Sequence, residues 1–237
     1  MTALTRVVQA LAVIVLAGGA GFLAYRLTAR HTSTITVAPA ATVTFPEAQT
    51  PLAAPAPVPR QVPEAVPDLA LPDPAGVRRK LSEWKGRPTL FNFWATWCEP
   101  CRREIPLLLK LRREHAADGV EVVGIAVDSR DAVLKYAQDM HIDYPVLVGE
   151  QEGFEAVQAF GMETVLPFTV FTDRQARIVT LKVGELHPDE AAFILDRIKD
   201  VDSGRLALAD ARRQISAQIA QLAAERARAG TAEPAGR

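Results

Sequence analysis

The sequence predicts an α/β fold in which a central mixed sheet is flanked by helices. Segments typical of buried strands alternate with segments typical of helices, a turn-linked pair of strands follows, and a last helix closes the domain. A C-x-x-C pair, Cys98 and Cys101, stands where one strand passes into a helix. Strands separated by helices pair in parallel, and strands joined by a short turn pair antiparallel. We therefore expect parallel first strands and an antiparallel last pair.

Near the start of the chain, residues 7–27 contain a run from Val7 to Tyr25 that is apolar except for Gln9 and is close to the length needed to cross a bilayer as a helix. We interpret it as an uncleaved signal anchor. The alternative is a signal peptide cut near Ala20, because Gly18 and Ala20 are small residues in a cleavage-like arrangement. Apolar residues continue past that point to Tyr25, which favours the anchor.

Residues 28–67 form a Pro- and Ala-rich linker, with six prolines from Pro51 to Pro67. Such a segment favours extended polyproline geometry, so we expect a semi-rigid tether that holds the domain away from the membrane. The basic residues Arg26 and Arg30 follow the apolar segment, and under the positive-inside rule they disfavour export of the domain that follows. We still expect an extracytoplasmic domain, because a short leader before an apolar segment commonly exports what comes after it.

The folded domain is predicted to cover residues 68–201. Turn residues between short extended runs predict an opening hairpin. Short apolar runs with aromatic enrichment predict strands, and capping residues mark helix ends. In order, the sequence predicts a hairpin at 68–80, a helical turn at 81–84, a strand at 89–94, a helix at 98–117 stopped by Gly119, a strand at 120–127, a helix at 132–140 capped by Ser129 or Asp131, a strand at 144–148, a helix at 154–160, strands at 167–172 and 178–183, and a helix from 187.

Residues 202–237 form an Ala- and Arg-rich tail that we expect to be helical. Leu208, Ile215, Ile219 and Leu222 give a thin apolar stripe at roughly helical spacing. Such a stripe is compatible with packing on the domain, with binding of a partner helix, or with a solvated helix. The sequence does not choose among these arrangements.

Composition excludes several classes of function. The 237-residue chain has a formal net charge of −1, whereas a protein that binds nucleic acid normally presents a basic face. Its two cysteines form neither a disulfide scaffold nor a four-sulfur zinc site, and its four histidines show no ligand spacing to them. We therefore expect no nucleic-acid partner, no metal and no cofactor.

The two cysteines instead indicate a redox pair. Unpaired backbone N–H groups and the helix dipole favour a thiolate at a helix N-terminus, which makes Cys98 the predicted nucleophile. Cys101, one turn later on the same face, is the predicted resolving thiol and should be more buried. Glu99 lies between them and would disfavour the thiolate, which favours the disulfide form and a role as reductant. We expect Trp94 and Trp97 to pack around the site, and Trp97 is also a candidate for a substrate-docking surface.

Several segments in this region resemble one family. They are Trp84-Lys85-Gly86-Arg87-Pro88, Asn92-Phe93-Trp94-Ala95-Thr96-Trp97-Cys98, Pro100-Cys101 and Arg103-Glu104-Ile105-Pro106. Together they resemble the membrane-anchored, thioredoxin-like thiol–disulfide oxidoreductases of bacteria, the TlpA/ResA/CcmG group, which is linked to cytochrome c maturation and related periplasmic reduction. The resemblance covers about residues 68–201. It implies a thioredoxin-like fold and a place at the inner membrane of a bacterium, with the catalytic domain in the periplasm.

The resemblance also implies roles for individual residues. A glutamate at the position of Glu104 is implicated in tuning and protonating the thiols, and the alternative is a surface ion pair with a nearby arginine. Leu166-Pro167 occupies the place of a cis-proline that faces the cysteine pair, where the Leu166 backbone would pair with a substrate peptide. Two residues depart from the family: Phe168 stands where threonine is usual, which leaves substrate preference open, and Ala176 stands where glycine is common in the hairpin turn.

The predicted function is extracytoplasmic thiol–disulfide exchange, with the protein acting as a reductase of protein disulfides. Electrons would come from an integral membrane thiol donor and leave to a disulfide-bearing protein such as apocytochrome c. A disulfide oxidase with the same chemistry is one alternative. Another is a copper-handling binding module, which usually adds a distal histidine, and His187 is the only histidine late in the domain. A peroxidase would need its reactive cysteine in a different setting.

Overall fold

The structure is a computed structural model that describes residues 61–163 and 165–231. The expected membrane segment at 7–27, the linker up to residue 60 and the tail from residue 232 lie outside the described residues. No helix in the described part of the chain is long and apolar enough to cross a membrane. The chain divides into two compact units, and every described residue belongs to the second, Pro57–Arg237.

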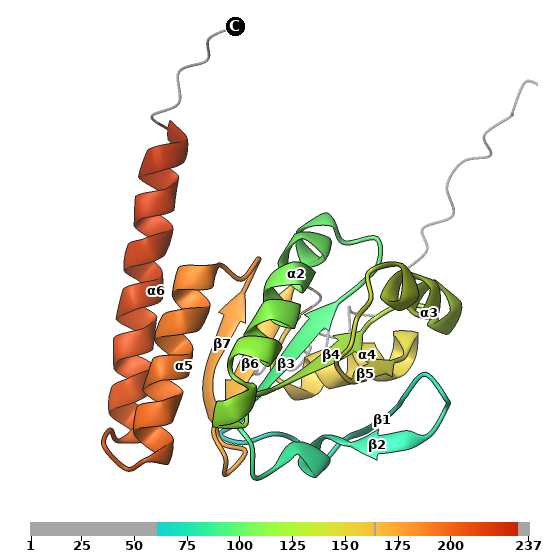
Figure 1. Cartoon of the computed structure of the whole chain (residues 1–237), viewed down its shortest axis with the longest axis horizontal. Helices are drawn as coiled ribbons and strands as arrows, with labels where there is room; N and C mark the ends of the chain where they lie inside the picture. Colours follow the sequence, from blue (N-terminus) through green and yellow to red (C-terminus); the bar gives the residue numbers. More distant parts are fainter. Residues whose placement is uncertain (1–60, 164, 232–237) are drawn as a thin grey trace, which may run out of the picture. The chain divides into compact units, whose positions relative to one another are not determined.

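Five strands form the central sheet in the order β5-β4-β3-β6-β7 (Figure 1). β3 pairs with β4, and β4 with β5, in parallel, whereas β6 runs antiparallel to both β3 and β7. The predicted mixed sheet, with parallel first strands and an antiparallel last pair, is confirmed. A separate hairpin, β1 with β2, precedes the sheet. The strands are β1 (Ala70–Pro72), β2 (Arg78–Lys80), β3 (Thr89–Trp94), β4 (Glu121–Ala126), β5 (Val146–Val148), β6 (Phe168–Thr172) and β7 (Ile178–Val183).

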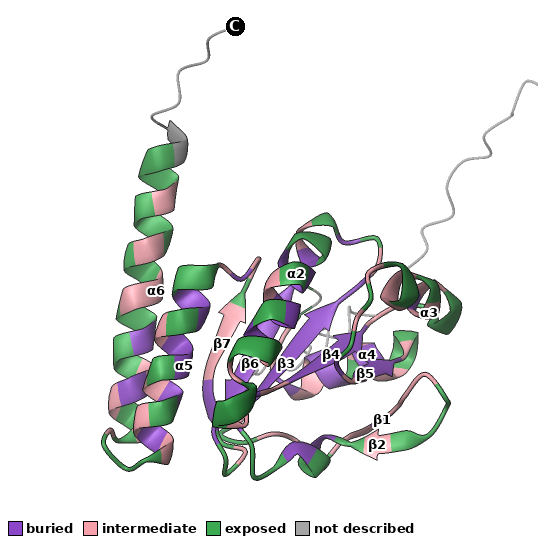
Figure 2. Cartoon of the chain, viewed as in Figure 1, coloured by how far each residue is buried: buried purple, intermediate pink, exposed green. Residues whose placement is uncertain are grey.

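Helices cover both faces of the sheet. One apolar cluster gathers side chains of α2, α3, α5 and α6 on one face, and a second gathers those of β1, η1 and α4 on the other. Burial is concentrated in the sheet and in the helix surfaces that face it (Figure 2). The helices are η1 (Leu81–Trp84), α2 (Glu99–Glu114), η2 (Ala116–Asp118), α3 (Arg130–Asp139), α4 (Glu150–Ala159), α5 (Pro188–Asp202) and α6 (Leu208–Thr231), of which η1 and η2 are 3₁₀ turns.

β3 lies at the centre of the sheet, and every residue in it is buried. Successive side chains of a strand point to opposite faces. Leu90 and Trp94 accordingly join the cluster that includes α2, whereas Phe91 and Phe93 join the cluster that includes α4. Asn92 shares the α2 side of the strand, so the interior next to the cysteine-bearing helix contains a polar group.

Element boundaries differ from the prediction at three helices, of which α3 spans Arg130–Asp139 rather than 132–140. α2 ends at Glu114 rather than at residue 117, and η2 follows before Gly119 adopts the left-handed conformation at φ 77°. α4 begins at Glu150 rather than at residue 154. Ser129 is the N-cap of α3, but its side chain makes no capping hydrogen bond. Its backbone N–H donates instead to Oδ1 of Asp128 at 2.7 Å, so the preceding residue stabilises this turn.

Ordered structure begins before residue 68. Ala65 forms an antiparallel bridge with Arg177, and the backbone N–H of Val66 donates to the carbonyl of Ala176 at 3.0 Å. Part of the segment expected as a tether therefore pairs with the turn between β6 and β7. Ala176 itself has a φ of 63°, in the left-handed region that favours glycine, which explains why a glycine suits this turn.

The C-terminal tail forms α6, and the first half of this helix packs on the domain. Ala211 and Ile215 are buried, and Ile219 is partly buried against the same cluster. Nη2 of Arg212 donates to the backbone carbonyl of Ile178 at 2.6 Å. Most of the later residues of α6 are exposed (Figure 2). Of the three arrangements that the sequence left open, packing on the domain is the one observed.

Candidate functional site

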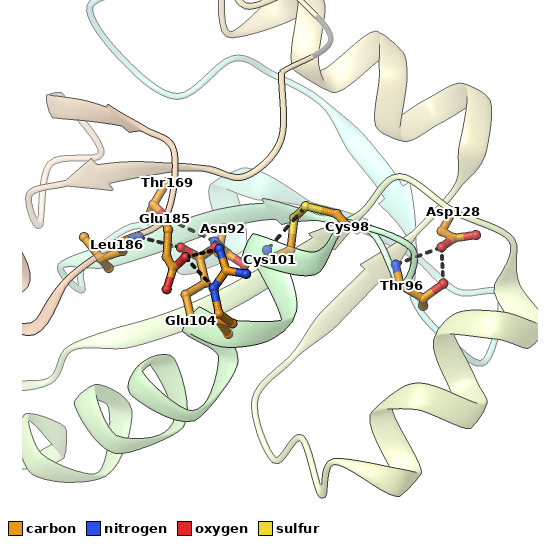
Figure 3. The surroundings of a disulfide bond; sticks show 10 residues. Asn92, Thr96, Cys98, Cys101, Glu104, Asp128, Thr169, Glu185 and Leu186 are labelled. Atoms are coloured by element: carbon orange, nitrogen blue, oxygen red, sulfur yellow. Dashed lines mark hydrogen bonds and ion pairs between the residues drawn. A yellow bond between two sulfur atoms is a disulfide. The ribbon is translucent and has the colours of Figure 1, made fainter. Parts of the chain in front are cut away.

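Cys98 and Cys101 form a disulfide where β3 passes into α2 (Figure 3). Cys98 is the N-cap of α2, and its Sγ accepts a hydrogen bond from the backbone N–H of Cys101 at 3.3 Å. Cys98 is 6% exposed, whereas Cys101 is fully buried. An incoming thiol therefore reaches Cys98 first, and the first turn of the helix points an N–H group at its sulfur. This geometry suits Cys98 as nucleophile and Cys101 as resolving thiol.

A carboxylate beyond the end of β4 fixes the loop that leads to Cys98. Oδ2 of Asp128 accepts hydrogen bonds from the backbone N–H of Thr96 at 2.9 Å and from its hydroxyl at 2.6 Å (Figure 3). Because β3 and β4 are parallel, their carboxyl ends meet at one edge of the sheet. No sequence motif singled out Asp128, although an acidic residue just after a buried strand was an available signal.

Glu104 lies one turn after Cys101, in the interior of the protein. It is 1% exposed, and each of its carboxyl oxygens accepts one hydrogen bond (Figure 3). The donors are Nδ2 of Asn92 at 2.7 Å and the backbone N–H of Leu186 at 2.8 Å. Both donors are neutral and the side chain is buried. The alternative of a surface ion pair with an arginine is therefore wrong.

Burial dominates the charge state of Glu104. Removal from water penalises the carboxylate and raises the pKa of Glu104 from 4.5 to about 7. The hydrogen bonds from Leu186 and Asn92 act in the opposite direction and lower this pKa, but they do not outweigh the effect of burial. The charge of Glu185 raises this pKa further, and that of Lys182 lowers it. A carboxyl group that titrates near neutral pH, one turn from a buried thiol, can accept a proton and return it.

Two polar residues that sequence analysis missed complete this environment. Nδ2 of Asn92 donates both to Glu104 and, at 3.0 Å, to the hydroxyl of Thr169 on β6. Oδ1 of Asn92 is buried and has no hydrogen-bond partner within the described residues. When Glu104 is protonated, rotation of the Asn92 amide would present this oxygen to the carboxyl O–H. An asparagine among the apolar residues from Leu90 to Trp94 was the signal that could have revealed the role of Asn92.

Glu99 lies in a different environment from the one its expected role requires. Its side chain is 82% exposed and pairs with Arg103 at 3.2 Å. Nη2 of Arg103 also lies 2.7 Å from Oε2 of Glu185. Solvent and the arginine both screen this carboxylate, so its effect on the Cys98 thiolate is weaker than the sequence suggests. Glu104, in the low-dielectric interior, is the carboxyl group placed to act on the cysteine pair.

The peptide bond between Leu166 and Pro167 is cis, as the resemblance implies. Phe168, the first residue of β6, pairs with Phe93 of β3. The proline therefore lies at the end of the sheet from which the chain runs on to Cys98. The backbone N–H and C=O of Leu166 have no hydrogen-bond partner within residues 61–163 and 165–231, so they are available to an extended peptide.

Apolar side chains are exposed next to this end of the sheet. Trp97 is 68% exposed and Val165 is 47% exposed, although large apolar side chains are usually covered. Trp97 precedes the reactive cysteine, and Val165 precedes the open Leu166 backbone. Trp94 is fully buried, which confirms its packing role. Trp97 does not share that role, and its exposure suits a docking surface.

His187, considered above as a distal copper ligand, is the N-cap of α5. Its backbone N–H donates to Oε2 of Glu190 at 3.1 Å. In the part of the chain that the structure describes, no group of three or more His, Cys, Asp or Glu side chains is arranged to hold a metal ion.

Comparison with known proteins places this site in a family. The model of the AhpC/TSA family matches residues 62–197, more than half of the chain. The chain belongs to the AhpC/TSA family. The match ends inside α5, so α6 lies outside the part that the family model covers.

Relatives and a solved structure agree with this assignment. Thiol-disulfide oxidoreductase ResA of Geobacillus thermodenitrificans is 28% identical over 139 residues, which are 58% of this chain and 78% of the relative. Thioredoxin-like protein YneN of Bacillus subtilis is 32% identical over 143 residues, 57% of this chain and 79% of the relative. A crystal structure from Chlorobium tepidum, assigned to a thiol:disulfide interchange protein DsbE, matches with a TM-score of 0.52 and 25% identity over 59% of this chain and 95% of its own.

The fold is thus thioredoxin-like, with a central mixed sheet between helices. Family membership, the C-x-x-C disulfide at the N-terminus of α2 and the buried carboxyl group one turn later together make this protein a thiol–disulfide oxidoreductase.

Proposed function

We propose that this oxidoreductase is an extracytoplasmic reductase of protein disulfides, held at a bacterial membrane by its N-terminal segment. The observation that carries the proposal is the order of three groups along α2. Cys98 caps the helix, Cys101 is buried behind it, and Glu104 is buried one turn further on. The apolar run from Val7 to Tyr25 supports the anchor and the extracytoplasmic location.

Reduction begins when the Cys98 thiolate attacks one sulfur of the substrate disulfide. A mixed disulfide forms, and the other substrate sulfur leaves as a thiolate and takes up a proton. The Cys101 thiolate then attacks the sulfur of Cys98, which releases the second substrate thiol and closes the Cys98–Cys101 disulfide. Two electrons pass from the protein dithiol to the substrate, and two protons end on the substrate thiols.

Glu104 is placed to take the proton of Cys101. Cys101 is fully buried, and burial in apolar surroundings disfavours a thiolate, so the resolving step needs a nearby base. A carboxyl group with a pKa of about 7 supplies that base at neutral pH, and it returns the proton when the disulfide is reduced again.

The surroundings of the cysteines support the reductase direction. Stabilised thiolates favour the reduced form and make a dithiol pair oxidising. The Cys98 sulfur accepts one backbone N–H, but both cysteines are buried in an apolar cluster with a buried carboxyl group nearby. These features oppose thiolate formation and favour the disulfide, so electrons flow out of the dithiol. The buried Glu104, rather than Glu99, is thus the carboxyl group that disfavours the thiolates.

An extended peptide with apolar side chains is the substrate that the site accommodates. The N–H and C=O of Leu166, which have no partner among the described residues, can pair with a peptide backbone, and the exposed side chains of Trp97 and Val165 offer apolar contacts. The resemblance to the TlpA/ResA/CcmG group supports apocytochrome c as the substrate and an integral membrane thiol carrier as the electron donor.

The deciding experiment measures the reduction potential of the Cys98–Cys101 pair by equilibration against defined thiol buffers. We expect a value near or below that of thioredoxin, about −270 mV. A value near about −120 mV, typical of a strong periplasmic oxidant, would reverse the proposed direction. Cys101→Ser should accumulate a mixed disulfide with substrate, and Cys98→Ser should not. Accumulation on Cys98→Ser instead would contradict the assignment of the nucleophile.

The location has its own test. An impermeant protease added to spheroplasts should digest the domain that contains Cys98. Complete protection of the domain would place it on the cytoplasmic side and overturn this part of the proposal.

A further inference from the structure

The C-terminal helix α6 contacts the domain at a second place besides its packed first half. Arg226, near its end, lies against the first turn of α5. Nη1 of Arg226 is 2.9 Å from Oε1 of Glu190, and Nη2 hydrogen-bonds to Asp189. This contact comes from a helix that the family model does not cover, so it is a feature of this chain beyond the shared fold.

Glu190 is a buried carboxylate that two cations share. It is 1% exposed, and its Oε2 lies 3.4 Å from Nζ of Lys182, whose side chain is 11% exposed. Arg226 approaches the other carboxyl oxygen from solvent. A buried charge is stable only when partners compensate it. Lys182 and Arg226 balance the charges of Glu190 and Asp189, and loss of Arg226 would leave this group of side chains with one net negative charge.

Lys182 also holds one particular peptide group. Its Nζ donates to the backbone carbonyls of Val183 and Glu185, each at 3.0 Å. The carbonyl of Glu185 belongs to the same peptide group as the N–H of Leu186, which donates to Oε2 of Glu104 at 2.8 Å. Because a peptide group is planar, fixing its oxygen also fixes the direction of its N–H. One rigid unit therefore joins the ammonium group of Lys182 to the carboxyl group of Glu104.

We propose that Lys182, held by Glu190 and by Arg226 of α6, is a positioning residue that sets the charge state of Glu104 through the Glu185–Leu186 peptide group. The C-terminal helix thereby regulates the proton chemistry of the active site. In its consequence for catalysis, this inference rests on the proposed role of Glu104 as a proton acceptor.

The direction of the effect follows from charge. The peptide dipole between Lys182 and Glu104 has its oxygen toward the cation and its N–H toward the carboxylate, so it stabilises the ionised form of Glu104. Loss of Arg226 leaves Glu190 with Lys182 as its one cationic partner among the described residues. The ammonium group is then drawn toward Glu190, and its hold on the Glu185 carbonyl weakens. The pKa of Glu104 therefore rises.

Other titratable groups face Glu104 from the elements around it. Glu185, in the loop between β7 and α5, raises the pKa of Glu104. Tyr144, just before β5, is also electrostatically coupled to Glu104, and burial raises the pKa of this tyrosine so that it stays neutral. Cys98 and Cys101 are on the same helix. Exchange of Arg226 alters none of these groups, so a shift that follows it reports on α6.

The experiment titrates Glu104 directly by carbon-detected NMR of the full-length oxidised protein with ¹³C-labelled glutamate. The Glu104→Gln variant identifies the signal. We expect Lys182→Met to raise the midpoint by about one pH unit and Arg226→Gln to raise it by a smaller amount. Arg226→Lys keeps the charge and should restore the wild-type midpoint. Arg213→Gln is the matched control, because Arg213 pairs with Asp210 inside α6 and should leave the midpoint unchanged.

Unchanged midpoints in folded Lys182→Met and Arg226→Gln would overturn the proposal, as would an equal shift in Arg213→Gln. If Lys182→Met does not fold, Arg226→Gln decides alone, because the Arg226 side chain is 33% exposed and its exchange is better tolerated. The pH profile of disulfide reduction is a separate readout. Midpoints that shift while this profile stays fixed would refute the proton-acceptor role of Glu104 and leave the coupling to α6 standing.

Discussion

Glu99 and Glu104 have the same side chain on the same helix, yet their surroundings give them different chemistry. Glu99 is 82% exposed beside Arg103. Glu104 shares the inward face of Cys101, receives two neutral donors and has a pKa of about 7. A helix turns about 100° per residue, so small differences in position decide between solvent and core. One carboxyl group therefore lies in the interior on the face of Cys101, as the proposed proton exchange requires, and the other is solvated.

The pH dependence of stability should reveal Glu104. Folding raises the pKa of Glu104 from 4.5 to about 7, so the folded protein binds this proton more tightly than the unfolded chain. The resulting stabilisation is complete below pH 4.5 and is lost as the pH rises through 7. We expect the free energy of unfolding of the oxidised protein, relative to that of Glu104→Gln, to fall by about 3 kcal/mol over this window. Urea denaturation at a series of pH values measures it.

Glu99→Gln is the matched control for this measurement, because it removes an exposed carboxylate from the same helix. Its free energy of unfolding should follow that of the wild type at every pH. A constant difference between wild type and Glu104→Gln across the same pH range would show that the pKa of Glu104 is not raised by folding.

Among the elements, α4 shows how the segment before residue 68 is held. Gly161 follows this helix with a φ of 76°. A Cβ added there would lie 2.7 Å from the carbonyl oxygen of Gln61 and 3.0 Å from the backbone nitrogen of Val62. The chain therefore passes directly against the C-terminal end of α4 before it reaches β1. This close approach and the pairing of Ala65 explain why the ordered domain begins earlier than the sequence indicated.

Gly161→Ala should destabilise the protein more than Gly204→Ala. Both glycines have left-handed backbones, with φ of 76° and 74°, so both exchanges carry the same conformational penalty of about 1–2 kcal/mol. A Cβ at Gly204 would meet nothing within 4 Å, whereas one at Gly161 meets backbone. We expect the clash to add about 1–3 kcal/mol to the loss at Gly161 in urea denaturation. Equal losses would show that residues 61–62 do not pack against α4.

Across the whole molecule, three long-range connections assemble the site. The parallel pairing of β3 with β4 brings the loop before Cys98 to Asp128. The antiparallel pairing of β3 with β6 brings Pro167 to the same end of the sheet. The loop between β7 and α5 places the N–H of Leu186 on Glu104. Reactive sulfur, open backbone and exposed apolar surface thus gather at one end of the domain.

Trp97→Ser should separate recognition of a protein from the chemistry of the cysteines. Trp97 is 68% exposed, so its loss should hardly change stability, but it should remove an apolar contact with a protein substrate. We expect kcat/KM for a protein disulfide to fall by about tenfold, and the rate with a small disulfide to stay unchanged. Val77→Ser is the matched control, because Val77 is an apolar residue that is 57% exposed in the turn between β1 and β2. Equal losses with both substrates would assign Trp97 to the chemistry instead.

The sequence by itself determined the order of strands and helices, the mixed sheet, and the position of Cys98 at a helix N-terminus. These features follow from short-range patterns: apolar periodicity, capping residues and the C-x-x-C spacing. The family resemblance also singled out Glu104, which lies within its motifs, and Pro167, which occupies the place of the family's cis-proline far from those motifs in the chain. The helix boundaries predicted from the sequence were less accurate, because the end of α2 and the start of α4 depend on neighbouring turns.

Only the tertiary structure decided what surrounds those residues. Leu186 meets Glu104 across 82 positions of sequence, and Asp128 meets Thr96 across 32. No local pattern specifies such contacts, since they depend on which strands pair and on which face each helix covers. A side chain becomes buried only when the sheet and its helices pack over it, and the raised pKa of Glu104 follows from that burial. The packing of α6 on the domain and the ion pair between Arg226 and Glu190 are likewise tertiary contacts that no local pattern specifies.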